Sequence, residues 1–317
     1  MLNYIKAPYL ELKNYPAPIG IQSYYIPMED GINIRLCCWI NDSEGQSSRG
    51  TILLQQGYNE FIEKYFEVIE EFLKRGFSVI SFDWRGQGMS EKMLDNKNKA
   101  FIQDFSLHDS DLEKIMKDII EPLFPRPYIG VGHSMGGCLM LSALYKHPDF
   151  FDQAILSAPM LGFKNEILLM PIIAILSLFS KNDSYLLVSK PNMGKETPFE
   201  NNDVTTDKFR YERTQRLVRK APNLRLWGVT ISWAKAVKNR LKSMRAKNWA
   251  EKIKTKVLII NNLNDQVVDP DKINIMSKRL SESSIIEFNS TKHEIFMEKD
   301  IYRRELWKGI DNYLNIT

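Results

Sequence analysis

The chain has 317 residues, of which 44% are hydrophobic and 26% are charged, with a formal net charge of +4. This balance is typical of an ordinary globular protein with a sizeable core, so no disulfide or metal is needed to stabilise the fold. Cysteine is present three times, with two of the residues adjacent, which argues against a disulfide framework and favours a reducing compartment. We expect all three cysteines to be small apolar fillers of the core.

The N-terminus does not resemble a signal peptide, because residues 1–20 contain no basic flank followed by an apolar run. Residues 167–178 form the longest apolar run, which Pro171 interrupts. A membrane-spanning helix requires roughly 20 apolar residues, and this run is well short of that length. We therefore expect a cytoplasmic protein, with peripheral attachment to a membrane as an additional possibility.

Strand-like and helix-like segments alternate along most of the chain, the pattern of a mostly parallel sheet covered by helices on both faces. We expect strands at residues 32–40, 51–55, 77–82, 128–131, 154–156, 257–260 and 285–288. Helical periodicity predicts helices at residues 65–73, 112–119, 138–145, 273–280 and 302–313. Gly76 is expected to end the first of these helices.

This alternation stops between about residues 160 and 250, where no clear strand signal is present. In the second of two basic helical segments, an apolar stripe recurs at spacings of three and four residues, formed by Trp227, Ile231, Ala234, Val237 and Leu241. We interpret residues 160–250 as a helical cap inserted into one α/β domain, whose two parts are residues 1–159 and 251–317.

A G-x-S-x-G motif, Gly132-His133-Ser134-Met135-Gly136, lies between an expected strand and an expected helix. This context is typical of a nucleophile elbow, in which a strained turn exposes the serine hydroxyl above the sheet. Gly132 and Gly136 are expected to come into contact, which any Cβ atom would prevent. The alternative is an ordinary tight turn with an incidental serine. We expect Ser134 to be the nucleophile.

A serine nucleophile needs a base, and an acid that orients this base. Of the four histidines, His293 lies in a loop after the last strand, where the chain order nucleophile, acid, base places it. The alternative for His293 is a solvent-exposed loop histidine. Asp265 and Asp269 follow the strand at 257–260. We favour Asp265 as the acid, because Asp269 precedes Pro270 and resembles a helix N-cap.

Hydrolysis of an acyl group also needs donors for the negative charge that develops on the carbonyl oxygen. The backbone N–H of Met135, directly after the nucleophile, is one expected donor. The loop after residues 51–55 is expected to supply the other, from the N–H of Tyr58, because Gly57 allows a close approach of the backbone. The alternative is an ordinary turn in which Gly57 is only a bend.

Together these residues resemble the lysophospholipase and monoacylglycerol lipase branch of the α/β-hydrolases, also described as serine aminopeptidase-like. The residues that carry the resemblance are 56–60 with Lys64-Tyr65, 83–90, 132–137, 265–269 and His293-Glu294. The first of these resembles the family's H-G-x-x-E…R-Y loop, except that Gln56 stands where a histidine is common. Residues 83–90 resemble its D-x-R-G-x-G-x-S turn.

The resemblance implies an α/β-hydrolase fold, with a mostly parallel central sheet and a helical cap, and an enzyme that needs neither metal nor organic cofactor. Within this family, the sequence is most similar to bacterial lysophospholipases, through residues 85–88 and 267–269. We therefore expect hydrolysis of a lysophospholipid or monoacylglycerol through an acyl-enzyme on Ser134. The alternatives are a general carboxylesterase, an aminopeptidase-like amidase, and a membrane- or partner-binding module with a vestigial site.

The expected cap is strongly basic: residues 161–250 contain 17 Lys or Arg and 7 Asp or Glu, a net charge of +10, so the rest of the chain carries −6. One hypothesis is that the cap docks on an anionic membrane surface, at about 1 kcal/mol for each well-placed basic residue. Apolar side chains interleaved with these charges would then enter the interface, namely Phe209, Leu217, Trp227, Trp233 and Trp249. The alternative is that the basic faces are simply solvated and the tryptophans are packed inside. No recognised motif supports nucleic-acid binding, and we expect none.

Overall fold

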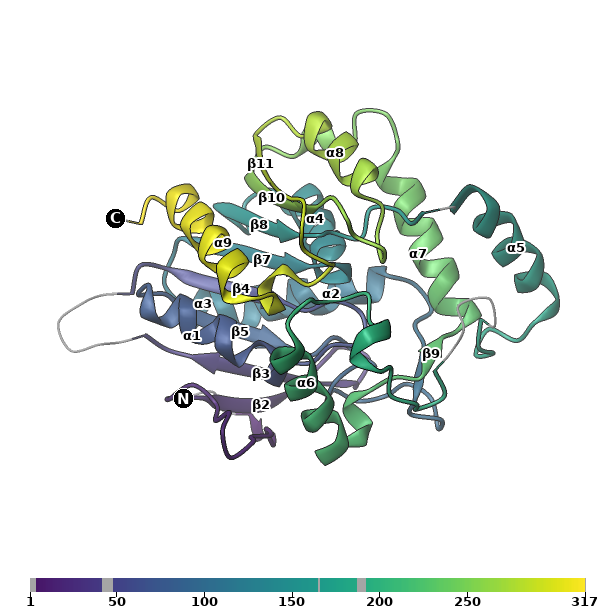
Figure 1. Cartoon of the computed structure of the whole chain (residues 1–317), viewed down its shortest axis with the longest axis horizontal. Coiled ribbons are helices and arrows are strands. Elements are labelled where there is room, and N and C mark those ends of the chain that lie inside the picture. Colours follow the sequence, from purple (N-terminus) through teal and green to yellow (C-terminus); the bar gives the residue numbers. More distant parts are fainter. Residues whose placement is uncertain (1–3, 42–47, 165, 187–191, 317) are drawn as a thin grey trace.

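A computed structural model describes residues 4–41, 48–164, 166–186 and 192–316. Its main sheet has the strand order β1-β2-β3-β5-β4-β7-β8-β10-β11, and the strands from β5 to β11 are all parallel (Figure 1). The bounds of the strands are Ile5–Lys6 (β1), Gln22–Pro27 (β2), Asn33–Trp39 (β3), Thr51–Gln55 (β4), Ser78–Phe82 (β5), Tyr128–His133 (β7), Gln153–Ser157 (β8), Lys256–Asn262 (β10) and Ser283–Phe288 (β11). The expected mostly parallel sheet is therefore confirmed.

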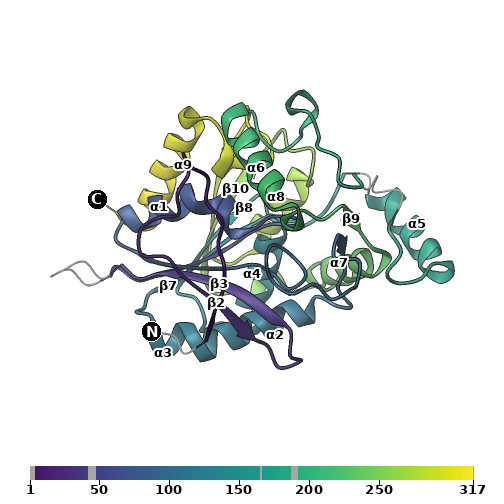
Figure 2. The same cartoon turned by 90° about the horizontal axis from the view of Figure 1, so that it is seen from below.

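Helices cover both faces of this sheet. On one face lie α1 (Phe66–Lys74) and α9 (Asp300–Tyr313), and on the other lie α2 (Ser106–Ile115), α3 (Glu121–Leu123), α4 (Met135–Lys146) and α8 (Pro270–Arg279) (Figures 1 and 2). Strand β4 shows why both faces are apolar: Ile52 and Leu54 pack toward α1, and Leu53 packs toward the opposite face. Because side chains alternate along a strand, a strand buried on both faces is apolar throughout.

The structure differs from the sequence prediction in several short elements. Strand β2 was not predicted, and the two-residue strands β6 (Lys99–Ala100) and β9 (Gly228–Val229) form a separate parallel pair. The second basic helix of the expected cap is α7 (Ile231–Met244), so Trp227 lies before this helix rather than on its stripe. After α2 the helix continues through a π-helical turn at Met116–Ile120.

The segment between β8 and β10 contains α5 (Glu166–Phe179), α6 (Lys208–Lys220) and α7, and extends past the carboxyl ends of the parallel strands (Figure 1). Its description as a separate cap stays an interpretation. Among the described helices, none combines the length and apolar composition needed to cross a membrane.

Several basic side chains of this segment bind carboxylates of the core. Arg210 and Arg213 on α6 contact Glu67 of α1 at 2.5 and 2.8 Å, and Arg240 on α7 contacts Asp109 of α2 at 2.5 Å. The opposite net charges of the segment and of the remaining chain are therefore partly compensated within the molecule.

The apolar side chains that were expected to enter a membrane interface occupy different environments. Leu217 and Trp249 are buried, so the expectation is wrong for these two residues. Trp227 and Trp233 are half-buried, and Phe209 is 63% exposed. These five apolar side chains therefore do not form one solvent-exposed surface. All three cysteines are buried thiols, as expected.

Candidate active site

Ser134 lies at the turn between β7 and α4, with backbone angles φ 52° and ψ −115°. A non-glycine residue rarely adopts this conformation, which costs free energy and persists only where the surroundings impose it. The turn is closed by glycines: a Cβ atom on Gly132 would stand 2.7 Å from the carbonyl oxygen of Gly136, and one on Gly136 would stand 2.5 Å from that of Gln55. The expected contact between the two glycines is thus present.

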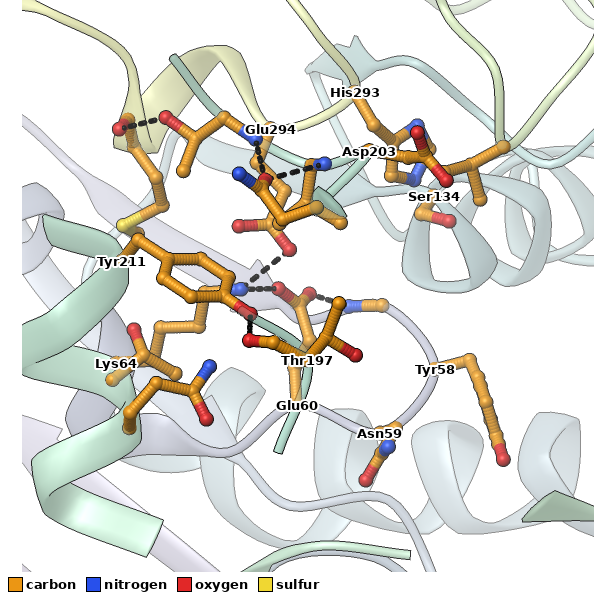
Figure 3. A pocket seen from close by; sticks show the side chains of 18 of the residues that line it. Tyr58, Asn59, Glu60, Lys64, Ser134, Thr197, Asp203, Tyr211, His293 and Glu294 are labelled. Carbon is orange, nitrogen blue, oxygen red and sulfur yellow. Dashed lines mark hydrogen bonds and ion pairs between the residues drawn. The ribbon is translucent and has the colours of Figure 1, made fainter. Parts of the chain in front are cut away.

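His293 and Asp265 form a direct contact, since Nδ1 of the imidazole lies 2.6 Å from Oδ2 of the carboxylate. The other carboxylate oxygen, Oδ1, accepts hydrogen bonds from the backbone N–H groups of Val267 (2.7 Å) and Val268 (3.0 Å). These contacts hold the carboxylate in one orientation. Ser134 lies beside the His293 ring in the same pocket (Figure 3). The structure therefore brings together the three side chains that the sequence singled out.

The alternative acid and the neighbouring histidine have other surroundings. Asp269 caps α8, where its carboxylate accepts the N–H of Asp271 at 3.0 Å. His133 packs against His293 with ring centroids 4.7 Å apart, and its Nδ1 lies 3.2 Å from the Ser157 hydroxyl. Burial lowers the pKa of His133 to about 3, so this ring is neutral at pH 7.

One expected oxyanion donor, the N–H of Met135, directly follows Ser134, and the other, the N–H of Tyr58, lies on the loop that begins at Gly57. Met135 is the first residue of α4, and such N–H groups have no acceptor within their own helix. Among the described residues, no acceptor contacts the N–H of Tyr58, whose ring packs against Trp233. A Cβ atom on Gly57 would stand 3.0 Å from Cβ of Ser134, so the loop passes close to the nucleophile. Both assignments as donors stay predictions.

Gln56, where the resemblance led us to expect histidine, is turned into the core. Its side-chain amide donates to the Ser81 hydroxyl at 2.8 Å, and its backbone carbonyl accepts from the Trp84 indole at 3.0 Å. The side chain is therefore bound to the neighbouring strand, and the loop is fixed without a histidine at this position.

A buried ionic network in the lining of the pocket has no counterpart in the sequence prediction. The Lys64 ammonium lies 2.5 Å from Oε1 of Glu60 and 2.6 Å from Oε1 of Glu294 (Figure 3). Oε2 of Glu60 accepts the N–H of Gly57 at 2.5 Å. Since Glu294 follows His293 directly, the network joins the loop at Gly57 to the histidine loop. The resemblance drew attention to Glu60 and Lys64, but nothing in the sequence pairs them with Glu294.

Charges within the network shift the pKa values of its members. Burial raises the pKa of Glu60, but the Lys64 ammonium and the N–H of Gly57, among other interactions, together outweigh this effect and lower it to about 2. Burial and the Glu60 charge raise the pKa of Glu294, and the two carboxylates raise the pKa of Lys64 despite its burial. Glu60, Glu294 and His133 lie within 4.8 Å of one another, a spacing that suits a metal ion. The Lys64 ammonium already binds both of these carboxylates.

The site opens into a cavity of about 650 Å³ between the sheet and the segment from β8 to β10. This volume lies within the range of small-molecule sites. The lining combines Ser134 and His293 with polar side chains of the segment between β8 and β10, among them Asn192, Thr197, Asp203, Tyr211, Gln215 and Arg225. The site is therefore accessible to a small organic molecule.

Comparisons with known proteins identify the family of this chain. The family model described as serine aminopeptidase, S33, matches residues 46–300. A probable lysophospholipase L2 of Haemophilus influenzae is 26% identical over 270 residues, which cover 84% of each chain. A monoacylglycerol lipase of Mycolicibacterium smegmatis is 27% identical over 129 residues, 41% of this chain and 43% of that protein.

Solved structures share the fold. The carboxyl esterase of Bacillus coagulans, in complex with glycerol, has a TM-score of 0.76 and 19% identity, covering 94% of this chain and 99% of that one. The monoglyceride lipase of Saccharomyces cerevisiae, in complex with a substrate analogue, has a TM-score of 0.73 and 18% identity, covering 97% and 99%. The chain belongs to the serine aminopeptidase S33 family and is a lysophospholipase- and monoacylglycerol lipase-like α/β-hydrolase.

Proposed function

We propose that this protein hydrolyses the carboxylic ester of a single-chain lipid, a lysophospholipid or monoacylglycerol, through an acyl-enzyme on Ser134. The observation that carries the proposal is the contact of 2.6 Å between His293 Nδ1 and Asp265, in the same pocket as a serine held at positive φ. This is the constellation of a nucleophile, a base and an orienting acid.

In the proposed mechanism, His293 takes the proton of the Ser134 hydroxyl as the oxygen attacks the ester carbonyl. Asp265 keeps the proton on Nδ1, so that Nε2 is the basic atom. The N–H groups of Tyr58 and Met135 stabilise the negative carbonyl oxygen. His293 then protonates the leaving glycerol oxygen. Water, deprotonated by the same imidazole, attacks the acyl-enzyme, and the fatty acid leaves as Ser134 regains its proton.

A substrate panel tests the substrate class. Lysophospholipid and monoacylglycerol of equal acyl length are compared with a short nitrophenyl ester and an aminoacyl anilide, and Ser134→Ala serves as the inactive control. We expect kcat/KM to be highest for the single-chain lipids. A higher value for the short ester would favour a general carboxylesterase, and a higher value for the anilide would favour an amidase.

A binding module with a vestigial site is the alternative from another class. It is tested with a fluorophosphonate, which reacts only with an activated serine. We expect the wild-type protein to be labelled and Ser134→Ala to remain unlabelled. A folded wild-type protein that is not labelled would support the vestigial site.

Membrane contact is a further part of the proposal. Helix α5 presents Ile175 and Leu178 to solvent, with 58% and 77% of these side chains exposed, and it belongs to the basic segment. Apolar groups of this kind, next to basic residues, favour an anionic lipid surface. We expect tighter binding to anionic than to neutral vesicles at low salt, and weaker binding of Ile175→Ser with Leu178→Ser. Equal binding to both vesicles would contradict this.

A further inference from the structure

Among the described residues, three with cationic side chains line the cavity, and two of these cations form ion pairs. Lys64 binds two carboxylates, as described above, and Arg210 contacts Glu67 at 2.5 Å and Asp300 at 2.6 Å. Arg225 differs from both, because it forms no salt bridge with any described carboxylate. The cavity therefore contains one guanidinium whose charge is not balanced by an ion pair.

The surroundings of Arg225 explain why it stays unpaired. Its guanidinium donates to the side-chain oxygen of Gln215, a neutral group. The charge of Glu196 raises the pKa of Arg225, but the Glu196 carboxylate is bound to Arg219 at 3.0 Å. Asp203, which also lines the cavity, forms no salt bridge with Arg225. Burial lowers the pKa of Arg225, as expected for a partly buried cation without a compensating carboxylate.

Arg225 is fixed close to the proposed oxyanion loop. The next residue, Leu226, donates its N–H to Oδ1 of Asn59 at 2.6 Å and accepts a hydrogen bond from Nδ2 of the same side chain at 3.1 Å. Asn59 follows Tyr58 directly. These two hydrogen bonds join the segment that carries Arg225 to the loop beside Ser134, and both Arg225 and Ser134 line the same cavity.

We propose that Arg225 binds the phosphodiester of a lysophospholipid headgroup in this cavity. The inference rests on the proposed function, since it assumes that a lipid ester reaches Ser134. A guanidinium matches the geometry of phosphate oxygens and stays charged under all ordinary conditions. A phosphodiester also supplies the counter-charge that no carboxylate of the described residues supplies. The site therefore selects a phosphorylated glycerol over free glycerol as the leaving alcohol.

The test compares Arg225→Gln with the wild type on two substrates of equal acyl length, a lysophospholipid and a monoacylglycerol. Arg219→Gln is the matched control, because Arg219 belongs to the same segment, is exposed and does not line the cavity. A charge-assisted hydrogen bond lost on binding predicts a fall of about tenfold or more in kcat/KM for the lysophospholipid. We expect a change below about threefold for the monoacylglycerol, a smaller loss in Arg225→Lys, and no selective change in Arg219→Gln.

Fluorophosphonate labelling of each variant separates the possible failures. Labelling of Arg225→Gln at the wild-type rate shows that the fold and the nucleophile are intact. Suppose that the wild type is labelled, but that Arg225→Gln lowers kcat/KM equally for the lysophospholipid and the monoacylglycerol, or for neither substrate. The proposed headgroup site is then overturned, while the proposed hydrolase function is not. If wild type is neither labelled nor active, the proposed function itself fails.

Competition distinguishes a lipid headgroup from free phosphate. Glycerophosphoethanolamine and inorganic phosphate are each added to the monoacylglycerol assay. We expect the phosphodiester to inhibit wild type more strongly than inorganic phosphate does, and this inhibition to weaken in Arg225→Gln. Equal inhibition by inorganic phosphate, or none by either compound, would overturn the assignment to a headgroup.

Discussion

Replacing Lys64 with methionine removes the cation that Glu60 and Glu294 share, while a side chain of similar length remains. Both carboxylates are almost completely buried, and each lies within 2.6 Å of the ammonium. Without it, they would be left as adjacent like charges in the interior, a costly arrangement. We expect Lys64→Met to destabilise the fold and to loosen the loop at Gly57, which Glu60 holds through a hydrogen bond.

The size of the expected destabilisation follows from the pKa of Glu60, which is lowered from 4.5 to about 2. Each pKa unit corresponds to about 1.4 kcal/mol, so the network stabilises the ionised carboxylate by about 3 kcal/mol. Because this folded-state pKa lies below the unfolded value, the contribution is present above pH 4.5 and is lost as the pH falls toward 2. The defect of Lys64→Met should therefore shrink as the pH is lowered through this range.

Urea denaturation at pH 7 and at about pH 3, which lies inside the range where the contribution is lost, measures this effect. Lys64→Arg, which keeps the charge, should lose less stability. The matched control is Lys74→Met on α1, whose lysine is 59% exposed and pairs with Glu70 at 3.4 Å; surface pairs of this kind contribute about 0–1 kcal/mol. The reasoning would be refuted if Lys64→Met cost no more free energy of unfolding than Lys74→Met, or if its cost were the same at both pH values.

Three further substitutions follow from the site. Asp265→Asn should lower kcat about 10⁴-fold, because it favours the wrong imidazole tautomer of His293. Asp269→Asn keeps a helix cap and should leave kcat within about twofold. Equal losses of kcat for the two variants in esterase assays would contradict the assignment of Asp265 as the acid. Gly57→Ala should lower kcat with little change in overall folding by circular dichroism, because its methyl group would stand 2.8 Å from Oε2 of Glu60 and 3.0 Å from Cβ of Ser134 and would displace the loop locally. Arg210→Met should lower the free energy of unfolding, measured by urea denaturation, by about 3 kcal/mol. Arg216 is exposed, and Arg216→Met should lower it by less than about 0.5 kcal/mol. Similar losses in both variants would refute the stabilising role given to the ion pairs of Arg210.

The fold was predictable where the signal is local. Strand β4 has an apolar centre, helix α4 is largely apolar, and the turn at Gly132 and Gly136 admits only small residues. Strands β6 and β9 were missed because two residues carry no periodicity, and their pairing depends on contacts between distant parts of the chain.

The meeting of Ser134, Asp265 and His293 was predictable for the same reason: each lies on a turn next to a recognisable strand. The network around Lys64 was not, because its partners Glu60 and Glu294 lie on different loops and only folding brings them together. The positive charge of residues 161–250 is visible in the sequence, but the binding of Arg210 to Glu67 is not.

The most direct test of the account is mass spectrometry of the protein after reaction with a fluorophosphonate. We predict one adduct per chain, on Ser134, which is absent in Ser134→Ala and forms much more slowly in His293→Ala. An adduct on another residue, or equally rapid labelling of Ser134 without the imidazole, would contradict the claim that His293 activates this serine.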